Sequence, residues 1–152
     1  PSTFGYYFLF VSACYMIGNF TAARLSTRMG TDRMVLLGTG ISVMAAWALG
    51  VFYLYDVWGP ISLFGSMGII ALGNGVSIPN GIAGAISVDT RLAGAASGIS
   101  GFTQMAFGAG STMLVGSLLV DTAAPLVIIM TIGATISFAM HIFGVRLFSA
   151  IR

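Results

Sequence analysis

Three amide side chains, Asn19, Asn74 and Gln104, interrupt long apolar stretches of the sequence. An amide without a hydrogen-bond partner in an apolar environment costs about 2–7 kcal/mol, so all three must face the interior of the protein. Asn74 and Gln104 each lie about 20 Å along their stretch, close to its middle. Membrane transporters bind substrates at this depth, but a lone amide also serves simply to join two helices. Both interpretations stay open.

A serine and a histidine offer a second kind of chemistry. Residues 98–101 read G-I-S-G, the G-x-S-G pattern of rhomboid-type intramembrane serine proteases, and His141 is the only histidine. A Ser100/His141 dyad would activate the hydroxyl as a nucleophile. Against it, Phe148 stands where a second glycine is expected after the histidine. An intramembrane serine protease therefore remains an alternative to a membrane protein that catalyses no reaction.

Other chemistry finds no residues to carry it. The sequence has no cluster of Cys, His, Asp and Glu for a metal ion and no Gly-Lys-Ser/Thr loop for a phosphate. The net charge is only +2, and the arginines form no basic patch that would suggest nucleic acid. We therefore expect no metal ion, no cofactor and no nucleic-acid partner.

The elements that position these residues follow from composition. Of the 152 residues, 57% are hydrophobic and only 7% are charged, against about 25% charged in soluble domains. The charges separate five uncharged runs, each long enough to cross the roughly 30 Å hydrocarbon core as a helix. We expect an all-α integral membrane fold with five transmembrane helices, at about 4–25, 33–55, 60–84, 92–119 and 124–147, and no separate soluble domain.

The arginines predict the orientation of these helices. Arg24, Arg28, Arg33, Arg91, Arg146 and Arg152 all fall at one side of the predicted bundle, and Asp56 and Asp121 fall at the other. By the positive-inside rule the arginine side is cytoplasmic, so the C-terminus lies inside. Locally, Asp32 is expected to cap the second helix and Pro60 to begin the third.

Small residues indicate how the helices pack. Helices in a membrane associate through close contacts of small side chains and through interhelical hydrogen bonds. The predicted helix 92–119 carries Gly94, Gly98, Gly101 and Gly108, and the predicted helix 60–84 is similarly rich in glycine. We expect these two helices to be central and those at 33–55 and 124–147 to be peripheral. The pair Pro79-Asn80 predicts a kink, as either a packing feature or a flexible point.

Three segments resemble the major facilitator superfamily. The first arginine-rich loop, residues 18–33, is similar to the second copy of that superfamily's cytoplasmic loop motif, although Thr27 replaces an acidic residue and Ala23 a glycine. The Pro79-Asn80 pair and the A-G-A-A-S-G run at 93–98 resemble the Bcr/CflA branch of drug:proton antiporters. The chain would then correspond to the last five of twelve helices, and its first residue, Pro1, fits a fragment.

This resemblance implies a function. It implies a bacterial inner-membrane secondary transporter that exports drug-like amphiphilic molecules by proton antiport and alternating access, surrounded by lipid and completed by N-terminal helices missing here. The expected substrate contacts are Asn74, Phe102, Gln104 and Phe107, and the expected gating residues are Arg24, Arg28, Gly30 and Arg33. No Asp or Glu lies inside a predicted span, so the proton-carrying residue is expected in the missing helices. A membrane scaffold that transports nothing is the remaining alternative.

Overall fold

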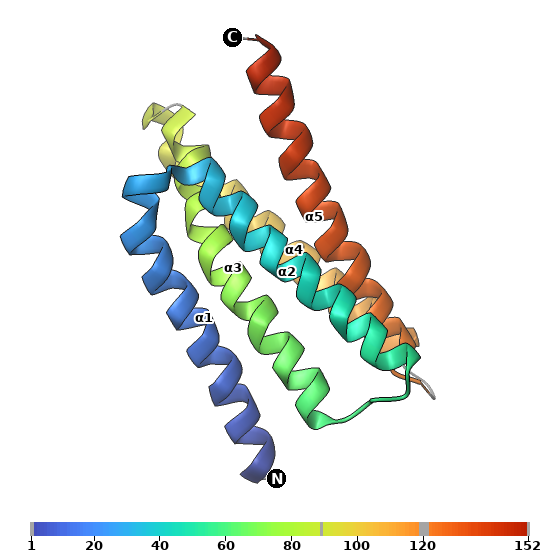
Figure 1. The fold of residues 1–152 in the computed structure, drawn as a ribbon. Helices are drawn as coiled ribbons and strands as arrows, with labels where there is room; N and C mark the ends of the chain where they lie inside the picture. The colour runs from blue at the N-terminus through green and yellow to red at the C-terminus, as the bar shows by residue number, and fades with distance from the viewer. Residues whose placement is uncertain (1, 89, 119–121, 152) are drawn as a thin grey trace.

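The structure, a computed structural model, describes residues 2–88, 90–118 and 122–151. These residues form five long α-helices and one 3-10 turn, without a strand (Figure 1). The elements are α1 Ser2–Met29, α2 Thr31–Leu54, α3 Pro60–Val88, η1 Thr90–Leu92, α4 Ala93–Leu118 and α5 Ala124–Ile151. The predicted all-α fold is confirmed, and each predicted helix is found with ends shifted by a few residues.

Four of the five helices are long and apolar enough to cross a membrane. They are the spans Phe4–Met29, Thr31–Leu54, Pro60–Ser87 and Ala124–Arg146. At 26 residues α4 is long enough as well, but its glycines, hydroxyl residues and Gln104 lower its hydropathy. The membrane crossing of α4 thus stays a prediction.

Local chemistry explains where α2 and α3 begin. Pro60 is the first residue of α3, as predicted, because a first-turn proline loses no helical hydrogen bond. The prediction that Asp32 caps α2 is wrong: the cap is Gly30, with φ 84°, and Asp32 lies inside the first turn. Gly30 is the single residue between α1 and α2, and only glycine adopts such a φ easily.

Close backbone contacts join α3 to α1 and to α2. A Cβ atom added at Gly75 would meet the Tyr15 carbonyl and lie 3.0 Å from the Asn19 nitrogen in α1. A Cβ atom added at Gly38 in α2 would lie 2.5 Å from the Gly73 carbonyl oxygen. Since hydrogen replaces the side chain at these crossings, α3 packs tightly between α1 and α2.

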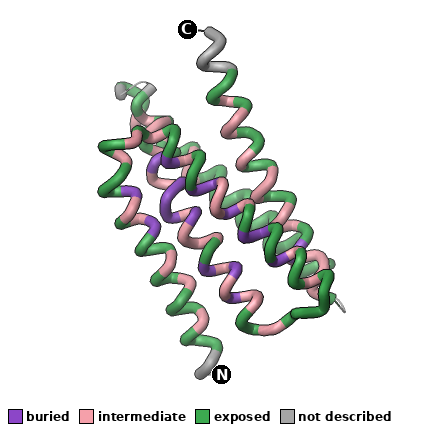
Figure 2. The backbone as a smooth tube through the Cα atoms, viewed as in Figure 1, coloured by how far each residue is buried: buried purple, intermediate pink, exposed green. Residues whose placement is uncertain are grey.

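The buried core follows these crossings. The most deeply buried large side chains are Met34 and Leu49, both on α2. Figure 2 shows the buried residues concentrated where α2 and α3 face each other and where α1 joins them. The two central helices of the structure are therefore α2 and α3.

The prediction that helices 60–84 and 92–119 are central is therefore wrong for the second of them. No described residue of α4 is buried, and Gly94, Gly98, Gly101 and Gly108 would each accept a Cβ atom without a contact within 4 Å. The glycine content alone did not show which glycines find a partner helix. The expected peripheral place of α2 is wrong for the same reason, since Gly38 lies at a close crossing.

The Pro79-Asn80 pair lies inside a continuous helix. Pro79 has no backbone N–H, yet α3 continues to Val88, four residues beyond the expected end. Asn80 is buried, and its side-chain amide donates to the Val76 carbonyl at 2.8 Å. This bond gives the buried Asn80 amide a partner within its own helix, and the predicted kink stays a prediction.

Candidate functional site

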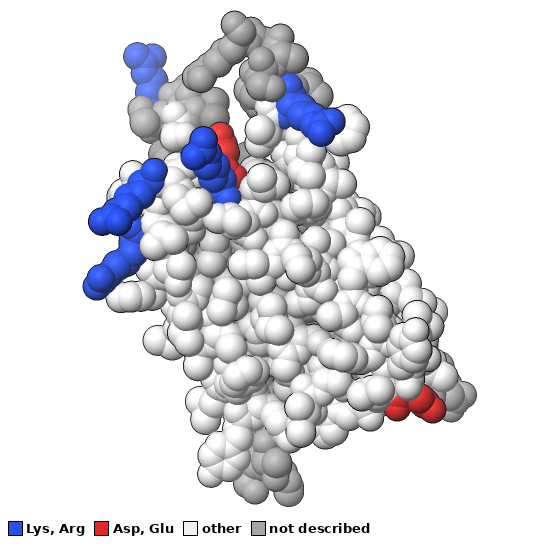
Figure 3. All heavy atoms as spheres, viewed as in Figure 1, with Lys and Arg blue, Asp and Glu red and all other residues white. Residues whose placement is uncertain are grey.

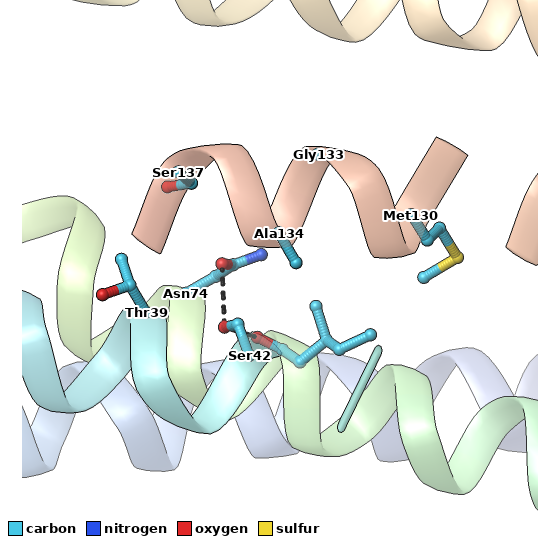
Figure 4. A pocket seen from close by; sticks show the side chains of 8 residues that line it. Thr39, Ser42, Asn74, Met130, Gly133, Ala134 and Ser137 are labelled. Atoms are coloured by element: carbon cyan, nitrogen blue, oxygen red, sulfur yellow. Dashed lines mark hydrogen bonds between the residues drawn. The ribbon is translucent and has the colours of Figure 1, made fainter. Parts of the chain in front are cut away.

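A cavity of about 270 Å³ lies between α2, α3 and α5. Its lining residues are Thr39 and Ser42 from α2, Ile70 and Asn74 from α3, and Met130, Gly133, Ala134 and Ser137 from α5 (Figure 4). None of them is charged, and four carry a hydroxyl or an amide. The cavity is thus a neutral polar site among apolar helices.

Hydrogen bonds fix one side of this cavity. The Ser42 hydroxyl lies 3.3 Å from the Asn74 Oδ1 atom and 3.3 Å from the Ile70 carbonyl oxygen, so it connects α2 to α3. The Thr39 hydroxyl donates to the Val35 carbonyl of its own helix at 2.8 Å. These contacts leave the Asn74 amide nitrogen as a donor available to another group.

The predicted substrate contacts are not brought together. Asn74 lines the cavity against α2 and α5. Phe102 and Phe107 lie on α4 with 75% and 74% of their surfaces exposed, and Gln104 between them is exposed too. Among the described residues, no contact joins Asn74 to these three residues of α4.

Thr39, Ser42 and Ser137 line the cavity but were not predicted from the sequence. Hydroxyl side chains in helices usually bond to a carbonyl of their own preceding turn, as Thr112 does with Gly108 at 2.9 Å. Residue type therefore does not reveal which hydroxyl turns toward a neighbour. The one available signal is depth, since Ser42 and Asn74 both fall near the middle of their helices.

The arginines gather at one end of the molecule (Figure 3). The Arg24 guanidinium lies over the Phe20 ring, 4.7 Å from its centre, which is a cation–π contact. Arg28 and Arg33 are exposed on either side of the Gly30 joint. The predicted positions of Asp121 and Arg152 lie outside the described residues.

Contacts between α2 and α5 use polar side chains at three levels. The Trp47 indole N–H donates to the Thr135 hydroxyl at 3.2 Å, and the Thr131 hydroxyl lies 3.2 Å from the Ala46 carbonyl oxygen. Near the arginine end, His141 Nε2 lies 3.0 Å from the Asp32 carbonyl oxygen. These bonds attach α5 to the bundle through α2.

The serine and histidine of the alternative protease have other partners. The Ser100 hydroxyl donates to the Ala96 carbonyl of its own helix at 2.8 Å, whereas His141 contacts α2. No hydrogen bond between Ser100 and His141 is found in the described structure. In the same part of the chain, no three His, Cys, Asp or Glu side chains group as a metal site would need.

Comparison with known proteins identifies one relative. No protein-family model and no solved structure matches the chain. The chain is 28% identical over 142 residues to the bicyclomycin resistance protein homolog of Haemophilus influenzae. This match covers 92% of the chain but only 35% of the relative, so the chain spans about a third of the relative's length. The resemblance inferred from the motifs is thus confirmed as a similarity in sequence to a drug-resistance protein.

Proposed function

We propose that this chain is the C-terminal part of a twelve-helix drug exporter of the Bcr/CflA type. The observation that carries the proposal is the similarity to a bicyclomycin resistance protein homolog over 92% of the chain. The five-helix, strand-free architecture of the described residues supports it, because secondary transporters of this kind are bundles of membrane helices.

In this proposal the exporter works by alternating access. Two helical halves rock around a site near the middle of the membrane, and proton entry drives export of an amphiphilic molecule. The Gly18–Gly75 and Gly38–Gly73 crossings support a part that moves as one piece, since they leave no space for sliding. The proton-carrying acid belongs to the rest of the protein, because the four Asp residues of this chain fall between the predicted membrane spans and the chain has no Glu.

The proposed roles of single residues follow from their places. Asn74 lines the cavity between α2, α3 and α5, near the middle of α3, and can bind substrate directly. Phe102, Gln104 and Phe107 are exposed on α4 and can contact substrate where that helix faces the missing half. Arg24, Arg28, Gly30 and Arg33 stand at the joint of α1 and α2, where gating contacts would form and break.

The proposed location is the bacterial inner membrane, with lipid around the bundle and the C-terminus in the cytoplasm. The arginines at one end of the bundle support this orientation (Figure 3), because positively charged loops remain on the cytoplasmic side. A cysteine placed after α5 in the full-length protein should therefore resist a membrane-impermeant maleimide in intact cells.

The experiment that tests the proposed function is drug efflux by the full-length protein. Produced in a bacterial strain without its own major exporters, it should raise the inhibitory concentration of bicyclomycin or of other amphiphilic drugs. A protonophore should abolish the outward movement of drug. If the protein reaches the membrane and the resistance to every drug of a broad panel is unchanged, the proposed function is wrong.

A further inference from the structure

Ser42 lies at the close crossing of α2 and α3. The residue is 5% exposed, and its backbone nitrogen lies 3.0 Å from the position that a Cβ atom would take at Gly73. The same Cβ atom would meet the Ser42 hydroxyl oxygen. Because Gly73 has no side chain, the hydroxyl has room beside the backbone of α3. The place of this hydroxyl is thus set by contacts within α2 and α3.

The hydroxyl of Ser42 has one proton and two oxygens within reach. The Asn74 Oδ1 atom and the Ile70 carbonyl oxygen each lie 3.3 Å from the Ser42 Oγ atom. In a helix, the carbonyl of Ile70 already accepts from the backbone N–H of Asn74, four residues further along. The Asn74 Oδ1 atom has no other donor among the described residues, so it gains more from the Ser42 proton.

This bond decides which end of the Asn74 amide faces the cavity. Half a rotation of the amide would exchange its oxygen and its nitrogen, and a donor on one side favours the oxygen there. Figure 4 shows the Asn74 oxygen joined to Ser42 and the nitrogen turned away from Ser42, toward Ala134 of α5. All three residues line the cavity. At this point the cavity therefore receives an N–H donor rather than an acceptor.

We propose that Ser42 is a positioning residue, which holds the Asn74 amide so that its N–H binds an acceptor oxygen of the transported molecule. The inference rests on the proposed function, in which Asn74 binds substrate. It names the substrate class as amphiphilic molecules that place a carbonyl or hydroxyl oxygen in the cavity. None of the residues lining the cavity is charged, so selection at this point depends on hydrogen bonding. A molecule without such an oxygen leaves the amide unpaired and binds less tightly.

The test is a cycle of binding measurements on the purified full-length protein. The probes are bicyclomycin and chloramphenicol, two drugs with carbonyl and hydroxyl oxygens, and their Kd values are measured by equilibrium dialysis. Ser42→Ala should raise the Kd about three- to tenfold, the effect of one hydrogen bond, and Asn74→Ala should raise it at least as much. Because Ser42 acts through Asn74, adding Ser42→Ala to Asn74→Ala should change the Kd less than about twofold.

The matched control is Thr39→Val, which removes a second hydroxyl from the same wall of the cavity. The Thr39 hydroxyl donates to the Val35 carbonyl of its own helix, so its loss should leave the Kd unchanged. Circular dichroism verifies that each variant is folded. An unchanged Kd in the Ser42→Ala protein overturns the proposal. Factors that multiply in the double variant also overturn it, because Ser42 then acts through helix packing and not through Asn74.

The same measurements separate this inference from the proposed function. Binding that weakens in the Ser42→Ala variant of a protein that exports no drug of the panel would contradict the proposed function and support the positioning role. Export of either drug, with a Kd that Ser42→Ala does not change, would do the reverse. A parent protein that binds neither drug saturably overturns the positioning role as well.

Discussion

The substitution Gly38→Ala tests whether the crossing of α2 and α3 depends on the absence of a side chain. A Cβ atom at Gly38 would lie 2.5 Å from the Gly73 carbonyl oxygen and 2.7 Å from the Ser77 backbone nitrogen. Both are backbone atoms that cannot rotate away. Ordinary contact begins at 3.4 Å, so the two helices must separate by 3.4 − 2.5, about 0.9 Å.

The size of the effect follows from two opposing contributions. Overpacking of this kind costs about 1–3 kcal/mol, while replacing a helical glycine by alanine gains about 0.5–1 kcal/mol through helix propensity. The second contribution is isolated by Gly84→Ala, because Gly84 lies in α3 with nothing within 4 Å of an added Cβ atom. Gly38→Ala should therefore be about 1–3 kcal/mol less stable than Gly84→Ala.

The assay is reversible unfolding of the detergent-solubilised full-length protein in a denaturing detergent, followed by circular dichroism. Each glycine variant is compared with the parent under identical conditions. Gly84→Ala should be the most stable of the three proteins, the parent should follow, and Gly38→Ala should be the least stable. Equal midpoints for the two variants would show that the helices adapt at no cost, and the close-crossing argument would then fail.

Three further predictions concern bonds and backbone. The changes Ser42→Ala and Asn74→Ala should be coupled by about 0.6 kcal/mol in a double-mutant unfolding cycle, the usual value for such a bond in a membrane; additive effects would contradict the bond. Thr135→Val should alter the indole fluorescence of Trp47, measured in a Trp58→Phe background, and an unchanged spectrum would disprove that contact. Gly30→Ala should destabilise by about 1–3 kcal/mol, because φ 84° with ψ 156° is essentially a glycine conformation; unfolding midpoints equal to the parent's would refute this.

The sequence was sufficient to predict the helices because long uncharged runs have few alternatives in a membrane. The positions of the charges, together with local signals such as Pro60, placed all five helices within a few residues of their observed ends. Pro60 was predicted correctly as the start of α3 because its chemistry acts within one turn. Asp32 was not, because the conformation of Gly30 moved the start of α2 earlier.

Packing was harder to predict, since it depends on which face of a helix meets a neighbour. Gly38 and Gly98 look alike in the sequence, yet one lies at a close crossing and the other has no contact within 4 Å of an added Cβ atom. For the same reason, only part of the candidate site could be predicted. Asn74 was identified by its amide in an apolar run, whereas Ser42 was missed because most hydroxyls bond within their own helix.

The single-residue joint at Gly30 would make α2 a lever if that helix were free. The 24 residues of α2 extend about 36 Å from this joint, so a 10° rotation about the Gly30 backbone would move the far end of the helix by about 6 Å. The close crossings at Gly38 and Gly75 prevent α2 from turning alone, so α1, α2 and α3 must turn together. α5 is attached to α2 by Trp47–Thr135 and His141–Asp32 and would be carried with them.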